Sequence, residues 1–122
     1  MAMVVRAYPL HAGMADLKGF GETLLGEKRK ETDDFFRRHG VSHESWHVQK
    51  IGDKEWIICC TKLSDRKAAE ASYGGSKDEF DSWFKQQVAA LTGIDPNETP
   101  LGLPSEEVFC WDERKRVDPA TI

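Results

Sequence analysis

Apolar and polar residues alternate through residues 44–62 on both sides of a Gly52-Asp53 step. Aromatic and β-branched residues favour strands, and glycine permits the positive φ of a tight turn, so this pattern predicts a β-hairpin. A two- or four-residue loop would divide its side chains between one apolar face and one mixed face. The apolar face would carry Trp46, Val48, Ile57 and Cys59, and the mixed face His43, Ser45, His47, Gln49, Trp56, Ile58 and Cys60. A three-residue loop would instead move Trp56 and Cys60 away from the face of His47.

Residues 2–10 also alternate, and predict a first strand that ends near Pro9, which has no backbone N–H to donate. One row of this strand is apolar, and the other contains Arg6 and Tyr8. We expect the apolar face of the hairpin to pack on the helices. We expect the row of Arg6 and Tyr8 to lie on the helix-free sheet face, together with the mixed face of the hairpin.

Helical spacing of apolar residues follows the first strand over residues 14–36, with a kink or break predicted between Gly21 and Glu27 because three glycines interrupt it. Gly40 would end this helical region. Ser64 or Asp65 would begin a short helix that runs through residue 73. The sequence Ser76-x-x-Glu79 resembles a capping box and predicts the start of the next helix. The stripe on that helix consists of Phe80, Trp83, Phe84, Val88 and Leu91, and Gly93 would end it.

Residues 106–111 (EEVFCW) predict a last short strand after an irregular connection that contains three prolines. The resulting order is that of the ferredoxin-like βαββαβ fold, an α+β domain with a four-stranded antiparallel sheet in the order 4-1-3-2 and helices on one face. We expect one such domain over residues 1–112 and a polar C-terminal tail over residues 113–122. The uncovered sheet face would be too apolar for water, which predicts a homodimer through this face.

The order of elements, the chain length and the aromatic helix segment FDSWF ahead of the proline-containing connection resemble the dimeric α/β-barrel superfamily. The resemblance implies that two ferredoxin-like protomers pack their sheet faces together. The superfamily includes cofactor-free monooxygenases, haem-degrading enzymes, lactone isomerases and stress-response proteins. The asparagine, tryptophan and histidine of the haem-degrading members do not align here, since the first strand has no asparagine and no histidine follows His47. No catalytic residue is carried over, and no cofactor is expected.

Composition excludes several classes of partner. The chain has 122 residues, a net charge of -4 and a pI near 5.6, so it has no basic field that would attract nucleic acid. The longest uncharged apolar run covers residues 56–61, far below the roughly 20 residues that span a bilayer. The N-terminus lacks the features of a signal peptide, and three cysteines suit a reducing compartment, so we expect a cytoplasmic protein that has no membrane partner.

Five residues form the predicted site on the helix-free sheet face. Arg6 there needs either an anionic ligand or a carboxylate of the partner protomer, because an unpaired buried charge is costly. Tyr8 and Trp56 would supply flat apolar walls, and Gln49 would be a further polar contact. His47 would act as a catalytic general base or as a hydrogen-bond donor. This arrangement predicts a binding protein or a cofactor-free enzyme for a small, partly aromatic anion, and leaves open whether the protein is an enzyme.

Other functional classes remain as alternatives. A structural or regulatory homodimer would fill the barrel interior with side chains. A thiol-redox protein would use Cys60, and a haem-binding or haem-degrading protein is a further alternative. No metal is expected: His43 and His47 lie four residues apart, which on a strand spans about 13 Å and prevents both from binding one ion.

Overall fold

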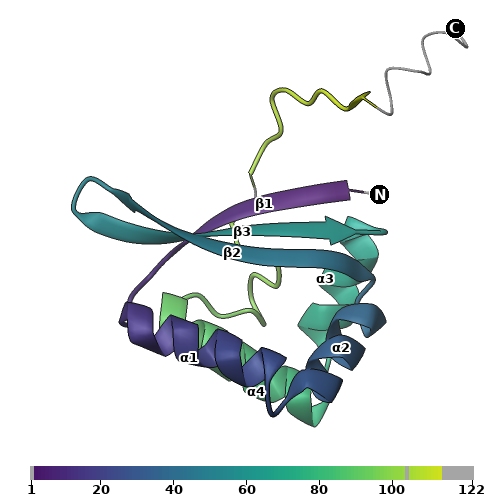
Figure 1. The fold of residues 1–122 in the computed structure, drawn as a ribbon. Helices are drawn as coiled ribbons and strands as arrows, with labels where there is room; N and C mark the ends of the chain where they lie inside the picture. The colour runs from purple at the N-terminus through teal and green to yellow at the C-terminus, as the bar shows by residue number, and fades with distance from the viewer. Residues whose placement is uncertain (1, 104, 114–122) are drawn as a thin grey trace, which may run out of the picture.

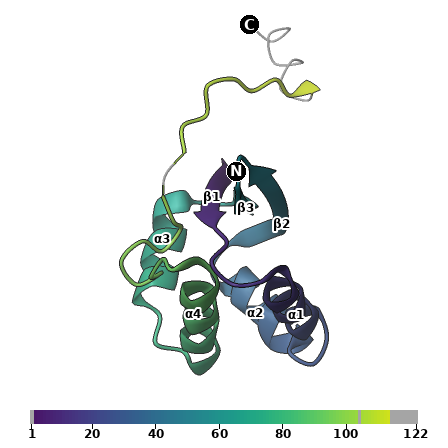
Figure 2. The same ribbon diagram turned by 90° about the vertical axis from the view of Figure 1, so that its left-hand side faces the viewer.

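The computed structural model describes residues 2–103 and 105–113, and these residues form an α+β fold (Figure 1). The elements in chain order are β1 (Ala2–Pro9), α1 (Met14–Leu25), α2 (Arg29–Arg38), β2 (Val41–Ile51), β3 (Lys54–Leu63), α3 (Arg66–Gly75) and α4 (Glu79–Thr92). Helices α1, α2 and α4 lie on one side of the sheet, and α3 lies beside β1 (Figure 2). None of the described helices is long and apolar enough to cross a membrane.

The sheet has three antiparallel strands in the order β1-β3-β2, not the four strands predicted from the sequence. The predicted fourth strand, residues 106–111, has no regular secondary structure and is not part of the sheet. It follows Ser105, whose hydroxyl donates to the backbone carbonyl of Val5. Side-chain composition indicates that a segment favours extended structure, but a strand also needs a pairing partner, which composition does not identify. Of the predicted polar tail, residues 114–122 lie outside the described residues.

The hairpin is confirmed with a two-residue turn. Gly52 has a φ of +66°, which glycine adopts without the strain that a side chain would add. In the resulting register His47 lies opposite Ile58, and Gln49 lies opposite Trp56. The mixed face therefore carries these residues together, and points away from the helices.

The first strand is turned the other way from the prediction. Arg6 lies opposite Cys59 and Tyr8 opposite Ile57, so both belong to the row that faces the helices. They are buried, with only 5% and 9% of their surfaces exposed. The prediction was wrong because it took the charged row as the outward one, and the alternation within the strand does not decide between its two faces.

The helices follow most of the sequence signals. The first helical stretch breaks at Gly26 as predicted, Asp65 caps α3, and Gly93 ends α4 in the left-handed conformation. The predicted capping box is wrong in its cap: Asp78, not Ser76, accepts hydrogen bonds from the first backbone N–H groups of α4. The helices and the inner sheet face enclose an aromatic core. Its buried residues are Tyr8, Leu17, Phe20, Leu24, Phe35, Ile57, Cys59, Tyr73, Phe84 and Leu91.

Candidate functional site

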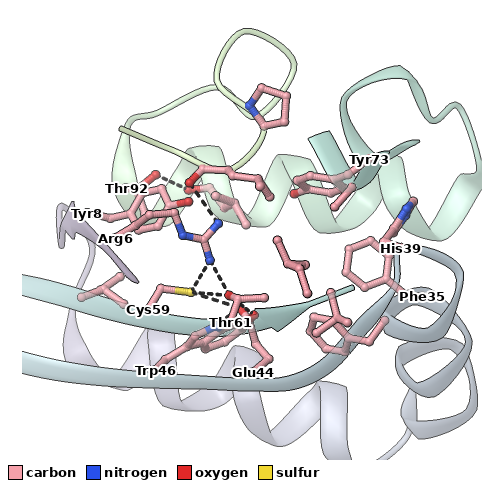
Figure 3. A pocket seen from close by; sticks show the side chains of 18 of the residues that line it. Arg6, Tyr8, Phe35, His39, Glu44, Trp46, Cys59, Thr61, Tyr73 and Thr92 are labelled. Carbon is pink, nitrogen blue, oxygen red and sulfur yellow. Dashed lines mark hydrogen bonds between the residues drawn. The ribbon is translucent and has the colours of Figure 1, made fainter. Parts of the chain in front are cut away.

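A cavity of about 100 Å³ lies between the inner face of the sheet and the helices (Figure 3). Most of its lining is apolar or aromatic, with a small polar group at the sheet. The residues of this polar group come from all three strands: Arg6 from β1, Glu44 from β2, and Cys59 and Thr61 from β3. His39 and Thr92 are further polar residues of the lining, from the helical side. Pockets of this composition, with few polar groups among apolar walls, are typical of small-molecule sites.

Arg6 is the central polar residue of this cavity. One terminal nitrogen, Nη1, donates to the backbone carbonyl of Leu101 at 2.9 Å. The other, Nη2, donates to the Sγ of Cys59 at 3.1 Å and to the Oγ1 of Thr61 at 2.6 Å. The buried Nε has no acceptor among the described residues. Arg6 therefore places a positive charge at the wall of a largely apolar cavity, and one of its buried donors has no partner in the described structure.

Glu44 compensates the charge of Arg6 without contacting it directly. Its carboxylate accepts from Thr61 Oγ1 at 2.5 Å and from Cys59 Sγ at 3.0 Å. It also accepts from the indole nitrogen of Trp46 at 2.7 Å. Thr61 and Cys59 thus stand between the guanidinium and the carboxylate, and no ion pair joins Arg6 to an acidic residue in the described part of the chain. The charge of Arg6 is compensated indirectly, and its buried Nε has no acceptor among the described residues.

Burial sets the protonation states around Arg6. Burial and the nearby Glu44 carboxylate raise the pKa of the Cys59 thiol to about 12, so this cysteine is protonated at neutral pH. Burial likewise raises the pKa of Tyr8 to about 12. Burial acts to lower the pKa of Arg6, but the neighbouring Cys59, Tyr8 and Glu44 outweigh this effect and raise it. The site therefore holds a permanent cation beside a thiol and a phenol that both keep their protons.

The loop after α4 covers the end of the cavity at Arg6. Besides the carbonyl of Leu101, this loop places Gly102 against the ring of Tyr8. A Cβ atom at Gly102 would lie 2.5 Å from the hydroxyl of Tyr8, and the φ of Gly102 is +77°. Both facts require glycine at this position. The close approach lets the loop pack directly on β1.

The structure divides the five predicted site residues between the two sheet faces. Arg6 and Tyr8 come together in the cavity, with the guanidinium carbon 5.9 Å from the centre of the tyrosine ring. His47 and Gln49 are exposed on the helix-free face, and Trp56 is half-buried beside them. The Nε2 of His47 contacts only its neighbour Ser45 in the described structure, at 3.2 Å. The predicted set is therefore not one site, because the sheet separates Arg6 from His47.

Sequence analysis missed the polar partners of Arg6. Glu44 lies two residues from Trp46 on β2, and Thr61 lies two residues from Cys59 on β3. Residues two apart on a strand share a face, so the sequence already placed Glu44 and Thr61 on the apolar face of the hairpin. A carboxylate and a hydroxyl on an otherwise apolar face need a buried partner. That requirement was the available signal for an inward-facing arginine on the neighbouring strand.

A second buried polar cluster, the Asp81 network, joins three helices away from the sheet. The carboxylate of Asp81, which is fully buried, accepts two hydrogen bonds from Arg38, at 2.8 and 3.1 Å. It also accepts from His39 Nε2 at 2.8 Å and from Ser76 Oγ at 2.6 Å. These donors outweigh burial, which acts to raise the pKa of Asp81, and lower it to about 2. The network ties the end of α2 to the start of α4.

His39 extends this network to Ser72, with 2.6 Å between Nδ1 and Oγ. Because ionised Asp81 only accepts hydrogen bonds, the histidine carries a proton on Nε2, and a neutral ring can accept the serine proton on Nδ1. This Ser-His-Asp order is that of hydrolase triads. However, Ser72 lies inside α3, so its backbone N–H and that of Tyr73 are committed to the helix and are not free to bind an oxyanion. The arrangement therefore supports a structural role.

No protein-family model matches this chain, and it matches no curated protein and no solved structure at a significant level. The described residues also contain no group of three or more histidine, cysteine or acidic side chains arranged to hold a metal ion. The function therefore has to be argued from the cavity around Arg6.

Proposed function

We propose that this protein binds a small organic carboxylate in the cavity between its sheet and its helices. The observation that carries the proposal is the Nε of Arg6, a buried donor on a charged group that has no acceptor in the described structure. A buried charged donor without a partner is costly, and a carboxylate oxygen would remove that cost through a charge-assisted hydrogen bond. The apolar walls around Arg6 would hold the body of the ligand.

The volume limits the ligand. An apolar cavity of about 150 Å³ accommodates benzene, and the cavity here measures about 100 Å³. A short aliphatic acid such as butyrate fits this volume better than a ring with substituents. The ligand expected from the sequence, a partly aromatic anion on the outer sheet face, is therefore replaced by a smaller anion on the inner face.

The cavity supports binding more than catalysis. His47, the predicted general base, lies on the opposite sheet face and cannot reach a ligand beside Arg6. The thiol of Cys59 keeps its proton at neutral pH, since its pKa is about 12, and so makes a poor nucleophile. The thiol-redox alternative concerns Cys60, which lies on the helix-free sheet face and not in this cavity.

Titration calorimetry with butyrate at neutral pH tests the proposal. We expect saturable binding to the wild-type chain, and at least tenfold weaker binding of butyramide, which has the same shape but no charge. Arg6→Met should abolish butyrate binding. Arg66→Met is the matched control, because Arg66 only pairs with Glu70 at the surface, and this variant should bind as the wild type does.

A second variant keeps the test valid if Arg6→Met does not fold. Val88→Phe adds volume to the lining of the cavity while leaving Arg6 and its partners in place. It should weaken butyrate binding in a chain whose circular dichroism is unchanged. The proposal fails if the wild type does not bind butyrate. It also fails if both cavity variants bind butyrate as the wild type does, because butyrate would then bind outside the cavity.

We also propose that two copies of the chain pair through the helix-free sheet face, as the dimeric α/β-barrel resemblance implies. Met3 and Val5 on this face are 44% and 40% exposed. The neighbouring strand adds Cys60, Ile58 and Trp56, which lie opposite Val5, Ala7 and Pro9. These five apolar side chains of two neighbouring strands form the patch that a second copy would cover. The structural homodimer predicted from the sequence is thus compatible with a ligand on the other face.

A further inference from the structure

Residues 105–113, here called the C-terminal arm, extend away from the body of the protein. Val108 is 90% exposed and Phe109 is 84% exposed, which makes them the two most exposed large apolar side chains described in the chain. A soluble chain rarely leaves adjacent large apolar side chains uncovered in an extended segment. The arm therefore needs a surface on which to pack.

The arm lies on the side of the sheet opposite the helices, as Figures 1 and 2 both show. It begins at the free edge of β1, where the hydroxyl of Ser105 donates to the carbonyl of Val5. Val5 itself belongs to the apolar helix-free face. The arm, with its exposed Val108 and Phe109, and the apolar sheet face therefore lie on the same side of the molecule.

We propose that the C-terminal arm is exchanged between two copies of this chain, each arm packing Val108 and Phe109 on the other copy. The inference rests on the proposed homodimer and adds the segment whose contacts would stabilise it. A two-fold axis through the helix-free face would bring each arm beside the partner, since the arm projects on that side. Both outer strands of the sheet, β1 and β2, have a free edge to which an extended segment can add.

Charge favours the same arrangement. Glu106 and Glu107 make the start of the arm acidic, whereas Lys62 on β3 is exposed on the helix-free side, in the same row as Met3. An acidic arm beside an exposed lysine is complementary across a dimer, which steers association and fixes orientation. The EEVFCW segment, predicted from the sequence as a fourth strand, would in this arrangement serve the sheet of the partner.

Light scattering on full-length chains provides the first test. The wild type should have twice the chain mass of 13.8 kDa at micromolar concentration. The double variant Val108→Asp, Phe109→Asp should dissociate at a concentration at least tenfold higher than the wild type does. Leu25→Asp is the matched control, because Leu25 is also exposed, at 66%, but lies on the helix side, and this variant should remain a dimer.

Photo-crosslinking separates exchange between copies from folding back on the same chain. Phe109→p-benzoylphenylalanine is prepared in unlabelled and isotope-labelled chains, which are mixed and irradiated. Cross-links that join labelled to unlabelled peptides are expected from arm exchange. Cross-links that join only peptides of the same isotope would overturn arm exchange. If the wild type is a dimer and the Val108→Asp, Phe109→Asp variant dimerises equally well, arm exchange is also overturned. A wild type of single-chain mass would overturn both proposals.

Discussion

Replacing Asp81 by asparagine removes the charge at the centre of the Asp81 network while keeping the size of the side chain. The wild-type carboxylate is fully buried and accepts hydrogen bonds from Arg38, His39 and Ser76. The asparagine has one acceptor oxygen in place of two and carries an amide that faces these donors. We therefore expect Asp81→Asn to fold with a lower free energy of unfolding.

The magnitude follows from the pKa of Asp81. A fall from 3.8 to about 2 corresponds to about 2 kcal/mol of stability at neutral pH, at about 1.4 kcal/mol per pH unit. Removing one partner of a buried pair costs about 3 kcal/mol or more, but Arg38 is 33% exposed and stays partly hydrated. The expected loss is about 2 to 3 kcal/mol.

Urea unfolding followed by tryptophan fluorescence measures this loss. The matched control is Asp34→Asn, since Asp34 pairs with the same arginine at 2.7 Å but is 66% exposed, and should cost less than about 0.5 kcal/mol. Because folding lowers the pKa of Asp81, its contribution is complete above pH 4 and is lost as the pH falls towards 2. The difference between the wild type and Asp81→Asn should therefore shrink over that range. Equal effects of the two substitutions at neutral pH would refute the assigned role of the network.

Two further predictions concern thiol reactivity and backbone conformation. Iodoacetamide at neutral pH should label the exposed Cys110 and leave Cys59 unmodified in the folded protein, because Cys59 is buried and its pKa is about 12. Mass spectrometry of the peptides measures the labelling of each cysteine, and rapid labelling of Cys59 would contradict this prediction. Gly93→Ala should lower the midpoint of thermal unfolding, since its Cβ would lie 2.6 Å from the ring of His11 at a φ of +76°, whereas Gly21→Ala, with open space around it in α1, should raise the midpoint. The opposite order of the two glycine variants would contradict this prediction.

Local patterns in the sequence predicted the hairpin and most helix boundaries correctly. The Gly52-Asp53 turn and the alternation around it determine which residues of β2 and β3 face the helices. Asp65 and Gly93 marked helix ends because each acts through neighbouring backbone groups alone. Such features depend on residues close in sequence, which is why the sequence is enough to predict them.

The candidate site depends on pairing between distant segments, and there the sequence was not sufficient. Arg6 reaches Thr61 and Leu101, which are far from it in sequence, and only the register of β1 against β3 brings them together. The rule that charged residues face outward assigned Arg6 to the wrong side. The rule failed because Glu44, which is linked to Arg6 through Cys59 and Thr61, supplies the compensating charge on the inner sheet face. The homodimer and the ligand remain predictions.

The Nε–H group of Arg6 offers the most direct test of carboxylate binding in the cavity. Its signal in a nitrogen-proton correlation spectrum is assigned by its disappearance in Arg6→Lys. Addition of butyrate should shift this signal to saturation, because the carboxylate becomes the acceptor that the buried donor lacks. Butyramide should shift it much less at the same concentration. A signal of Arg6 that stays in place while butyrate reaches millimolar concentration would contradict the account.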